Sequence, residues 1–159
     1  MTLDDFLTTR LDALLRFARV VTGDRAAAED AVQDVVVQLL RDPGRVERIA
    51  DLDAYARRMV VNGFISWRRK WSRIRPVALV PDRSASPAAA LDEIDALRGR
   101  LTGLPPRQRA VLALRYLFDL DDAAIARELG CSEGTVRSHA SRALATLRVA
   151  ATVHAEERA

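Results

Sequence analysis

Residues 121–140 constrain the fold more than any other segment, because two short helical patterns there flank a single glycine. Three apolar residues are spaced to form one core between the two helices: Ile125, Leu129 and Val136. Ala126 is small enough to let the helices approach closely, and Gly130 can adopt the positive φ that a tight turn requires. The segment therefore predicts a helix-turn-helix.

The second helix of this motif is predicted to begin after Ser132 and to expose polar side chains in its early turns. These are Arg137, Ser138, Ser141 and Arg142. Arginine can pair bidentately with guanine in the major groove, and serine can donate or accept a hydrogen bond. The motif favours reading of duplex DNA. An ordinary helical hairpin with a polar face is the alternative.

Apolar residues in the rest of the chain also recur at helical spacing, and only seven glycines and six prolines interrupt it. The first half predicts three helices, near residues 11–21, 28–39 and 51–75. The second half predicts four, near residues 91–101, 106–117, 121–129 and 132–148. Residues 149–159 are expected to fray. The predicted fold class is all-α.

Turn and cap residues separate these helices. Asp24 is placed to cap the second helix, and residues 42–44 (Asp-Pro-Gly) indicate a turn after it. Residues 75–90 are rich in Pro, Ser and Ala and lack periodicity, which indicates a flexible linker. The chain is therefore predicted to hold two small helical domains, residues 1–75 and 91–150, joined by a linker at residues 76–90.

Charge is sorted along the chain, although the net charge is only +3. Residues 57–75 hold seven basic residues and no acidic one, whereas residues 26–40 hold three acidic residues and no basic one. Such sorting often reflects two different partners. Trp67 and Trp71 interrupt the basic run on one helical face, so packing in the core and stacking on nucleic-acid bases both stay open.

Several motifs, in order, resemble the extracytoplasmic-function group (group IV) of the sigma-70 family of RNA polymerase sigma factors. Residues 14–24, 27–34 and 55–62 resemble sigma region two, and residues 104–116 and 134–138 resemble sigma region four. The resemblance spans roughly residues 3–148. The run from Ser66 to Trp71 is especially similar to compact actinobacterial members.

This resemblance implies three roles for named residues. Asp30, Gln33 and Asp34 would dock on the clamp coiled coil of the polymerase β′ subunit. A second set would capture and melt the minus-ten element, together with the loop at residues 45–51: Asn62, Ser66, Trp67, Arg68 and Arg69. A third set would read the minus-thirty-five element: Arg137, Ser138, His139, Ser141 and Arg142. The implied partners are promoter DNA, core polymerase (with its β flap also contacted) and an anti-sigma factor.

The sequence departs from the family pattern in two places. The docking helix carries Val36 and Leu40 where aromatic residues are common, so its packing is expected to differ. The reading helix carries His139 where arginine is common. A mostly neutral imidazole near pH 7 would weaken a phosphate contact there.

Other function classes find little support. Cys131 is the only cysteine and is expected to be a small buried residue of the turn. His139 and His154 lack metal-ligand spacing, so no metal or cofactor is predicted, and no catalytic motif indicates an enzyme.

No segment is predicted to be a signal peptide or to span a membrane, so a cytoplasmic protein is expected. The runner-up is a helix-turn-helix regulator of the response-regulator output type, and a helical enzyme is a weaker third.

Overall fold

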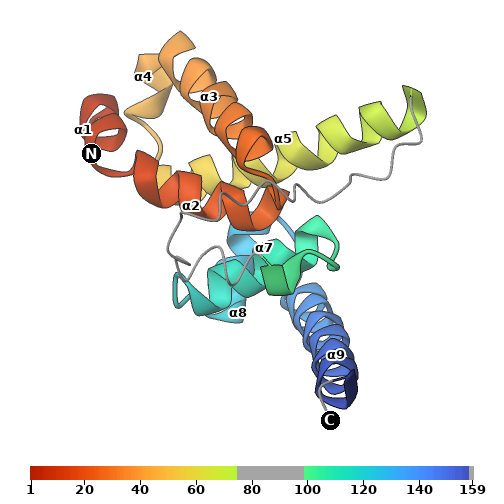
Figure 1. Ribbon diagram of the computed structural model, residues 1–159. Helices are drawn as coiled ribbons and strands as arrows, with labels where there is room; N and C mark the ends of the chain where they lie inside the picture. The colour runs from red at the N-terminus through yellow and green to blue at the C-terminus, as the bar shows by residue number, and fades with distance from the viewer. Residues whose placement is uncertain (75–98, 158–159) are drawn as a thin grey trace.

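The computed structural model describes residues 1–74 and 99–157, and these residues form helices and no strand. Figure 1 shows two helical layers, with α1 to α5 in the upper layer and α7 to α9 in the lower one. This arrangement confirms the predicted all-α fold of two helical units. The predicted linker at residues 76–90 lies outside the described residues, as does most of the helix predicted at residues 91–101.

The N-terminal unit is built around α2 (Leu11–Thr22), α3 (Arg25–Arg41) and α5 (Leu52–Ile74). Gly23 ends α2 in the left-handed region at φ 71°, and the Asp24 carboxylate accepts from the backbone N–H of Ala27 at 2.9 Å. This confirms Asp24 as the cap. Asp51 caps α5 in the same manner through the N–H of Ala54.

Two short helices in this unit were not predicted. Thr2 and Asp5 form a capping box that starts α1 (Leu3–Thr9), and buried Phe6 anchors that helix to the core. The segment read as a plain turn holds α4 (Pro43–Val46), because the Asp42 side chain accepts from the N–H of Arg45 and Pro43 suits the first helical position. The prediction of three helices in this half was therefore wrong.

The C-terminal unit consists of α7 (Pro106–Tyr116), α8 (Asp122–Leu129) and α9 (Glu133–Glu157). The three residues predicted to form the core of the helix-turn-helix, Ile125, Leu129 and Val136, are all buried, and Ala126 is also buried. Gly130 has the expected positive φ, at 69°. The helix-turn-helix prediction is confirmed at the level of structure.

Helix α9 continues well beyond the predicted boundary. Residues 149–157 were expected to fray, but they remain helical. This stretch contains neither glycine nor proline and is rich in alanine and glutamate, which are good helix formers. Figure 1 shows this end of α9 projecting away from the rest of the molecule.

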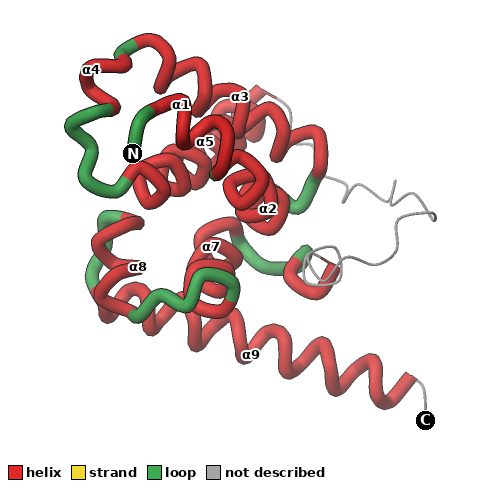
Figure 2. The backbone as a smooth tube through the Cα atoms, turned by 90° about the vertical axis from the view of Figure 1, so that its left-hand side faces the viewer, coloured by secondary structure: helices red, strands yellow, loops and turns green. Residues whose placement is uncertain are grey.

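The two units pack directly against each other. Helix α2 contacts both α5 of its own unit and α7 of the other, and α5 also contacts α8. Figure 2 shows α7 and α8 lying beneath the N-terminal helices in the perpendicular view. The sequence had predicted two separate domains and gave no indication of this contact. Across the described residues, no helix is long and apolar enough to cross a membrane.

The turn glycine gives a first testable prediction. Gly130→Ala places a Cβ on a left-handed residue, 3.0 Å from Nη2 of Arg58. We expect a loss of about 1–2 kcal/mol in the free energy of unfolding, and a lower Tm in thermal denaturation. Gly103→Ala is the control, because its Cβ would meet nothing within 4 Å. Equal Tm values for the two variants would show that alanine is not strained in the left-handed conformation of residue 130.

Candidate functional site

The first half of α9 has two distinct faces. Val136, Ala140 and Ala143 point into the core, whereas the predicted reading residues are all exposed: Arg137, Ser138, Ser141 and Arg142. The exposed residues are spaced at i, i+1, i+4 and i+5, which places them on one side of a helix. The structure therefore brings these four predicted residues together on a surface that duplex DNA can approach.

The surface around these four residues is positively charged and contains one weak ion pair. Arg137 Nη1 lies 3.7 Å from the Glu133 carboxylate, and both side chains are well exposed, so Arg137 can readily exchange Glu133 for another partner. His139 is half-buried, and its pKa is lowered by burial first and then by the charges of Arg107 and Arg142. A neutral imidazole between two cations suits a packing role better than a phosphate contact. Arg107 belongs to α7 and was not singled out from the sequence.

Asn62 and Ser66 lie one turn apart and are both exposed on α5. Their neighbours Val61 and Phe64 are buried, so the opposite side of the helix is held by the core. The structure thus places the two polar side chains together, free to meet another molecule. The predicted loop before α5 contacts the first turn of that helix, where the guanidinium carbon of Arg45 lies 5.9 Å from the centroid of the Tyr55 ring.

The two tryptophans do not pack in the core. Trp67 is 42% exposed and Trp71 is 49% exposed. They form a ladder of rings along α5, in which Phe64 stacks on Trp67 at 6.0 Å and Trp67 contacts Trp71 at 5.9 Å. Arg68 lies over Phe64 at 5.8 Å. Of the two alternatives left open by the sequence, core packing is therefore excluded.

A groove of about 280 Å³ runs between α3 and α5. One wall carries the three predicted docking residues, Asp30, Gln33 and Asp34, all of which are exposed. The other wall is largely apolar and is formed by Met59, Val60, Phe64 and Trp67. The sequence assigned Trp67 to the minus-ten element and the acidic residues to polymerase docking. In the structure Trp67 borders the same groove as the acidic residues.

Arg57 does not belong to the exposed basic surface, although it begins the basic run. Its side chain is only 11% exposed, and it pairs with Glu128 of the helix-turn-helix. Burial lowers the pKa of Arg57, but the hydrogen bonds to Glu128 together with the negative charges of Glu128, Asp51 and Asp53 outweigh it, so the net shift of the pKa is upward. No short-range pattern links residues 71 positions apart, so sequence reasoning missed this pair.

Arg109 of α7 is a second buried arginine at the contact between the units. It is 6% exposed, and its Nε has no hydrogen-bond partner within residues 1–74 and 99–157. Burial first, and then the charge of Arg68, lower its pKa to about 10, so the side chain stays charged at neutral pH. It lies beside Gly23 at the C-terminal end of α2, where the helix dipole offers a partial negative charge.

Comparison with known proteins shows the same division into two units. The family model for sigma-70 region 2 matches residues 6–74, and the model for sigma-70 region 4 matches residues 94–147. The "RNA polymerase sigma-E factor" of Streptomyces avermitilis is 37% identical over 154 residues, which cover 91% of this chain and 82% of that protein. The chain belongs to the extracytoplasmic-function group of sigma-70 factors.

Other sigma factors are similar over nearly the whole chain. The "ECF RNA polymerase sigma factor SigL" of Mycobacterium tuberculosis is 34% identical, covering 86% of this sigma factor and 81% of that one. A solved structure of the sigma factor RpoE in complex with the anti-sigma factor NepR, from Bartonella quintana, is 27% identical. It aligns with a TM-score of 0.76 over 94% of this chain and 96% of that chain.

No cluster of three or more His, Cys, Asp or Glu residues that could hold a metal ion occurs among the described residues of this sigma factor. His154 lies in the helical end of α9. Cys131 is a free thiol in the turn and is half-buried rather than fully buried as expected. Its backbone N–H donates to the carbonyl of Ala126, so the residue contributes to the turn itself.

Proposed function

We propose that this sigma factor binds core RNA polymerase through the groove between α3 and α5. Acidic and amide side chains on one wall and aromatic and aliphatic ones on the other suit an amphipathic helix that carries basic residues. The β′ clamp coiled coil is the partner that family membership favours, with the β flap as a second contact. In this proposal polymerase performs the chemistry, and the sigma factor is not an enzyme.

The second part of the proposal is promoter reading by α9 at the minus-thirty-five element. The observation that carries it is the single exposed face of Arg137, Ser138, Ser141 and Arg142 on the second helix of a helix-turn-helix. This is the element that enters the major groove in such motifs. Contacts from Arg107 to the DNA backbone would position the helix without specifying sequence.

The third part is capture of the minus-ten element by α5 as the DNA opens. Asn62 and Ser66 offer donors and acceptors to a base that has left the helix, while Trp67 and Trp71 offer exposed rings for stacking. The basic residues Arg68 and Arg69 would hold the backbone. Since the chain supplies no chemical energy, binding of the unstacked bases must offset the cost of opening.

The regulator alternative is not favoured. A response regulator would need a receiver of alternating strands and helices in its first half, whereas residues 1–74 form helices only.

The relative from Bartonella quintana is bound by an anti-sigma factor, so we include an anti-sigma factor among the proposed partners of this chain. Polymerase and promoters are cytoplasmic in bacteria, and we propose that this sigma factor acts there.

Run-off transcription tests the whole proposal. Purified chain is added to core polymerase on a promoter from its own gene neighbourhood, with core polymerase alone as the control. We expect a discrete transcript only in the presence of the chain. A chain that binds promoter DNA tightly without core polymerase and yields no transcript with it would instead support the regulator alternative.

The reading helix gives a second prediction. Arg137→Ala and Arg142→Ala should each cost about 1–3 kcal/mol in binding of the holoenzyme to its preferred minus-thirty-five sequence, and should relax specificity at one position. Binding to a promoter library measures both effects. Arg148→Ala is the matched control, because Arg148 is exposed further along the same helix. Equal losses for all three variants would show general charge attraction rather than reading by this face.

A further inference from the structure

Three aromatic rings form a stripe along the second half of α5. Phe64, Trp67 and Trp71 are spaced at i, i+3 and i+7, which places them on one side of the helix. Their exposed fraction rises along the stripe, from 5% at Phe64 to 42% at Trp67 and 49% at Trp71. The stripe therefore begins in the core and ends at the surface, so its two tryptophans lie in different surroundings.

Trp67 is the middle ring of the three. Phe64 stacks on it from one turn before, with the ring centroids 6.0 Å apart and an angle of 20° between the planes. Trp71 contacts it from one turn after, at 5.9 Å and 48°. A base needs an open ring face on which to stack. Because Trp67 has a neighbouring ring on each side along the helix, its exposed part is mainly the edge of the indole.

The Trp67 side chain also borders the acidic groove between α3 and α5, whose other wall carries Asp30, Gln33 and Asp34. The phosphates of DNA would be repelled by the two carboxylates there. A basic protein surface would be attracted, and a large indole with an N–H donor is a side chain that often anchors such a contact. The surroundings of Trp67 therefore favour a protein partner over DNA.

Trp71 lies among cations instead. It does not line the groove, and within residues 1–74 and 99–157 the only ring in contact with it is Trp67. Residues 57–75 contain no acidic residue, and Lys70 and Arg73 are exposed close to Trp71 in the helix. An open ring face among cations is the combination that binds single-stranded nucleic acid.

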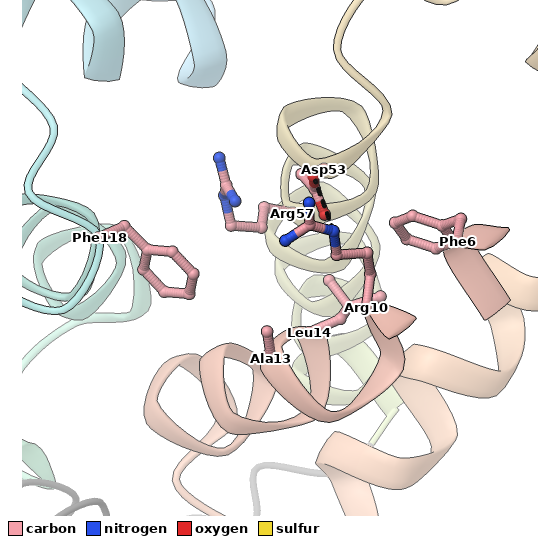
Figure 3. A pocket seen from close by; sticks show the side chains of 7 residues that line it. All are labelled: Phe6, Arg10, Ala13, Leu14, Asp53, Arg57 and Phe118. Carbon is pink, nitrogen blue, oxygen red and sulfur yellow. Dashed lines mark ion pairs between the residues drawn. The ribbon is translucent and has the colours of Figure 1, made fainter. Parts of the chain in front are cut away.

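The pocket beside Arg57, with a volume of about 120 Å³, is a poorer docking site because its charged side chains already have partners. Arg10 pairs with Asp53 at 3.7 Å, as the dashed line in Figure 3 marks. Arg57 pairs with Glu128 of α8. The two carboxylates of the groove between α3 and α5 have no ion pair within the described part of the chain. That groove therefore keeps its negative charge for a basic partner.

We propose that the two tryptophans serve different partners: Trp67 anchors polymerase in the groove, and Trp71 alone stacks on an unpaired base of the minus-ten element. Trp67 thus leaves the minus-ten set that the family resemblance implies and joins Asp30, Gln33 and Asp34. The occupant of the groove is a basic amphipathic helix, whose apolar side packs against Trp67 and whose cations meet the carboxylates. This division rests on the proposed function, which supplies both partners.

Two matched variants test the division, because they make the same change one turn apart on one helix. Trp67→Ala should weaken binding of core polymerase about thirtyfold or more, which is the loss typical of a central aromatic anchor, whereas Trp71→Ala should bind polymerase like the parent. Each fully assembled holoenzyme is then given a single-stranded oligonucleotide with the non-template minus-ten sequence. Trp71→Ala should weaken that binding about fivefold to a hundredfold, and Trp67→Ala should leave it unchanged.

Single-tryptophan chains give a second readout, which does not require loss of binding. The chain contains two tryptophans, so Trp67→Phe and Trp71→Phe each leave one, and phenylalanine keeps a ring in the stripe. Hydroxytryptophan incorporated into these chains is excited at wavelengths where the tryptophans of polymerase do not absorb. The emission of residue 67 should change when core polymerase is added, and that of residue 71 when the oligonucleotide follows. This readout decides the matter even if an alanine variant loses its helical content.

Equal losses for the two alanine variants in either assay overturn the division, as does emission from residue 67 that is unchanged by polymerase. The double variant Asp30→Arg with Asp34→Arg distinguishes this result from failure of the proposed function. If both the double variant and Trp67→Ala keep polymerase, docking occurs elsewhere and the proposed function fails at that step. If the double variant loses polymerase while Trp67→Ala keeps it, the groove is the docking site and only the role of Trp67 is overturned.

Discussion

Core polymerase will no longer co-elute with this sigma factor when both Asp30 and Asp34 are changed to arginine. The two carboxylates lie on one wall of the groove between α3 and α5, and no described cation pairs with them there. Losing two charge-assisted contacts should cost about 3–6 kcal/mol, or roughly a hundredfold or more in affinity, before any repulsion from the new charges. Gel filtration at moderate salt measures the loss.

The matched control is the pair Glu29→Arg and Asp12→Arg, which makes the same change in net charge. Glu29 is exposed on α3 outside the groove, where it pairs with Arg25, and Asp12 is exposed on α2. The control should lose far less affinity, and both double variants should keep their helical content. Retained co-elution of the Asp30 and Asp34 variant would show that polymerase binds another face.

The second large effect concerns opening of the promoter. Asn62→Ala should slow formation of the open complex by about fivefold to a hundredfold, since the hydrogen bonds to a captured base contribute about 1–3 kcal/mol. Asn62 is exposed, and alanine is the better helix former, so the variant should fold. Binding of polymerase and contacts to the minus-thirty-five element should stay at the level of the parent.

A template with a mismatched bubble at the minus-ten element separates base capture from other causes. The bubble already supplies the energy of unpairing, so it should restore much of the rate lost by Asn62→Ala. Permanganate footprinting on duplex and bubble templates follows the opening. An equal defect on both templates would show that Asn62 does not act on the unpaired base.

Local sequence patterns were enough to predict most of the helices. The cap at Asp24 and the glycine turn at Gly130 depend on contacts within a few residues, and Ile125 and Val136 share a core across one short turn. Contacts at such short separations leave a recognisable pattern in the sequence. The exposed reading face of α9 follows from the same periodicity, because a helix with one buried stripe must expose the opposite side. The short helices α1 and α4 were missed because one or two turns give too few residues for a period.

The groove between α3 and α5 and the exposure of the two tryptophans could be established only from the tertiary structure. Periodicity placed Trp67 and Trp71 on one side of α5, but it does not say whether a neighbouring helix covers that side. In the structure Trp67 borders the groove between α3 and α5, and both tryptophan rings remain partly exposed. Whether an amphipathic stripe becomes core or surface is decided by the packing of other helices.

The sequence by itself determined that the chain is all-α, where its helices cap and turn, and which side chains the reading helix exposes, because these depend on interactions between near neighbours. Only the tertiary structure decided that Arg57 meets Glu128, that the Nε of Arg109 is buried without a hydrogen-bond partner among the described residues, and that the two units are packed together. Those contacts join residues far apart in the chain, and each of these charged side chains could equally be exposed to solvent. Their pairing is fixed by how whole helices fill space, which no local pattern of residues encodes.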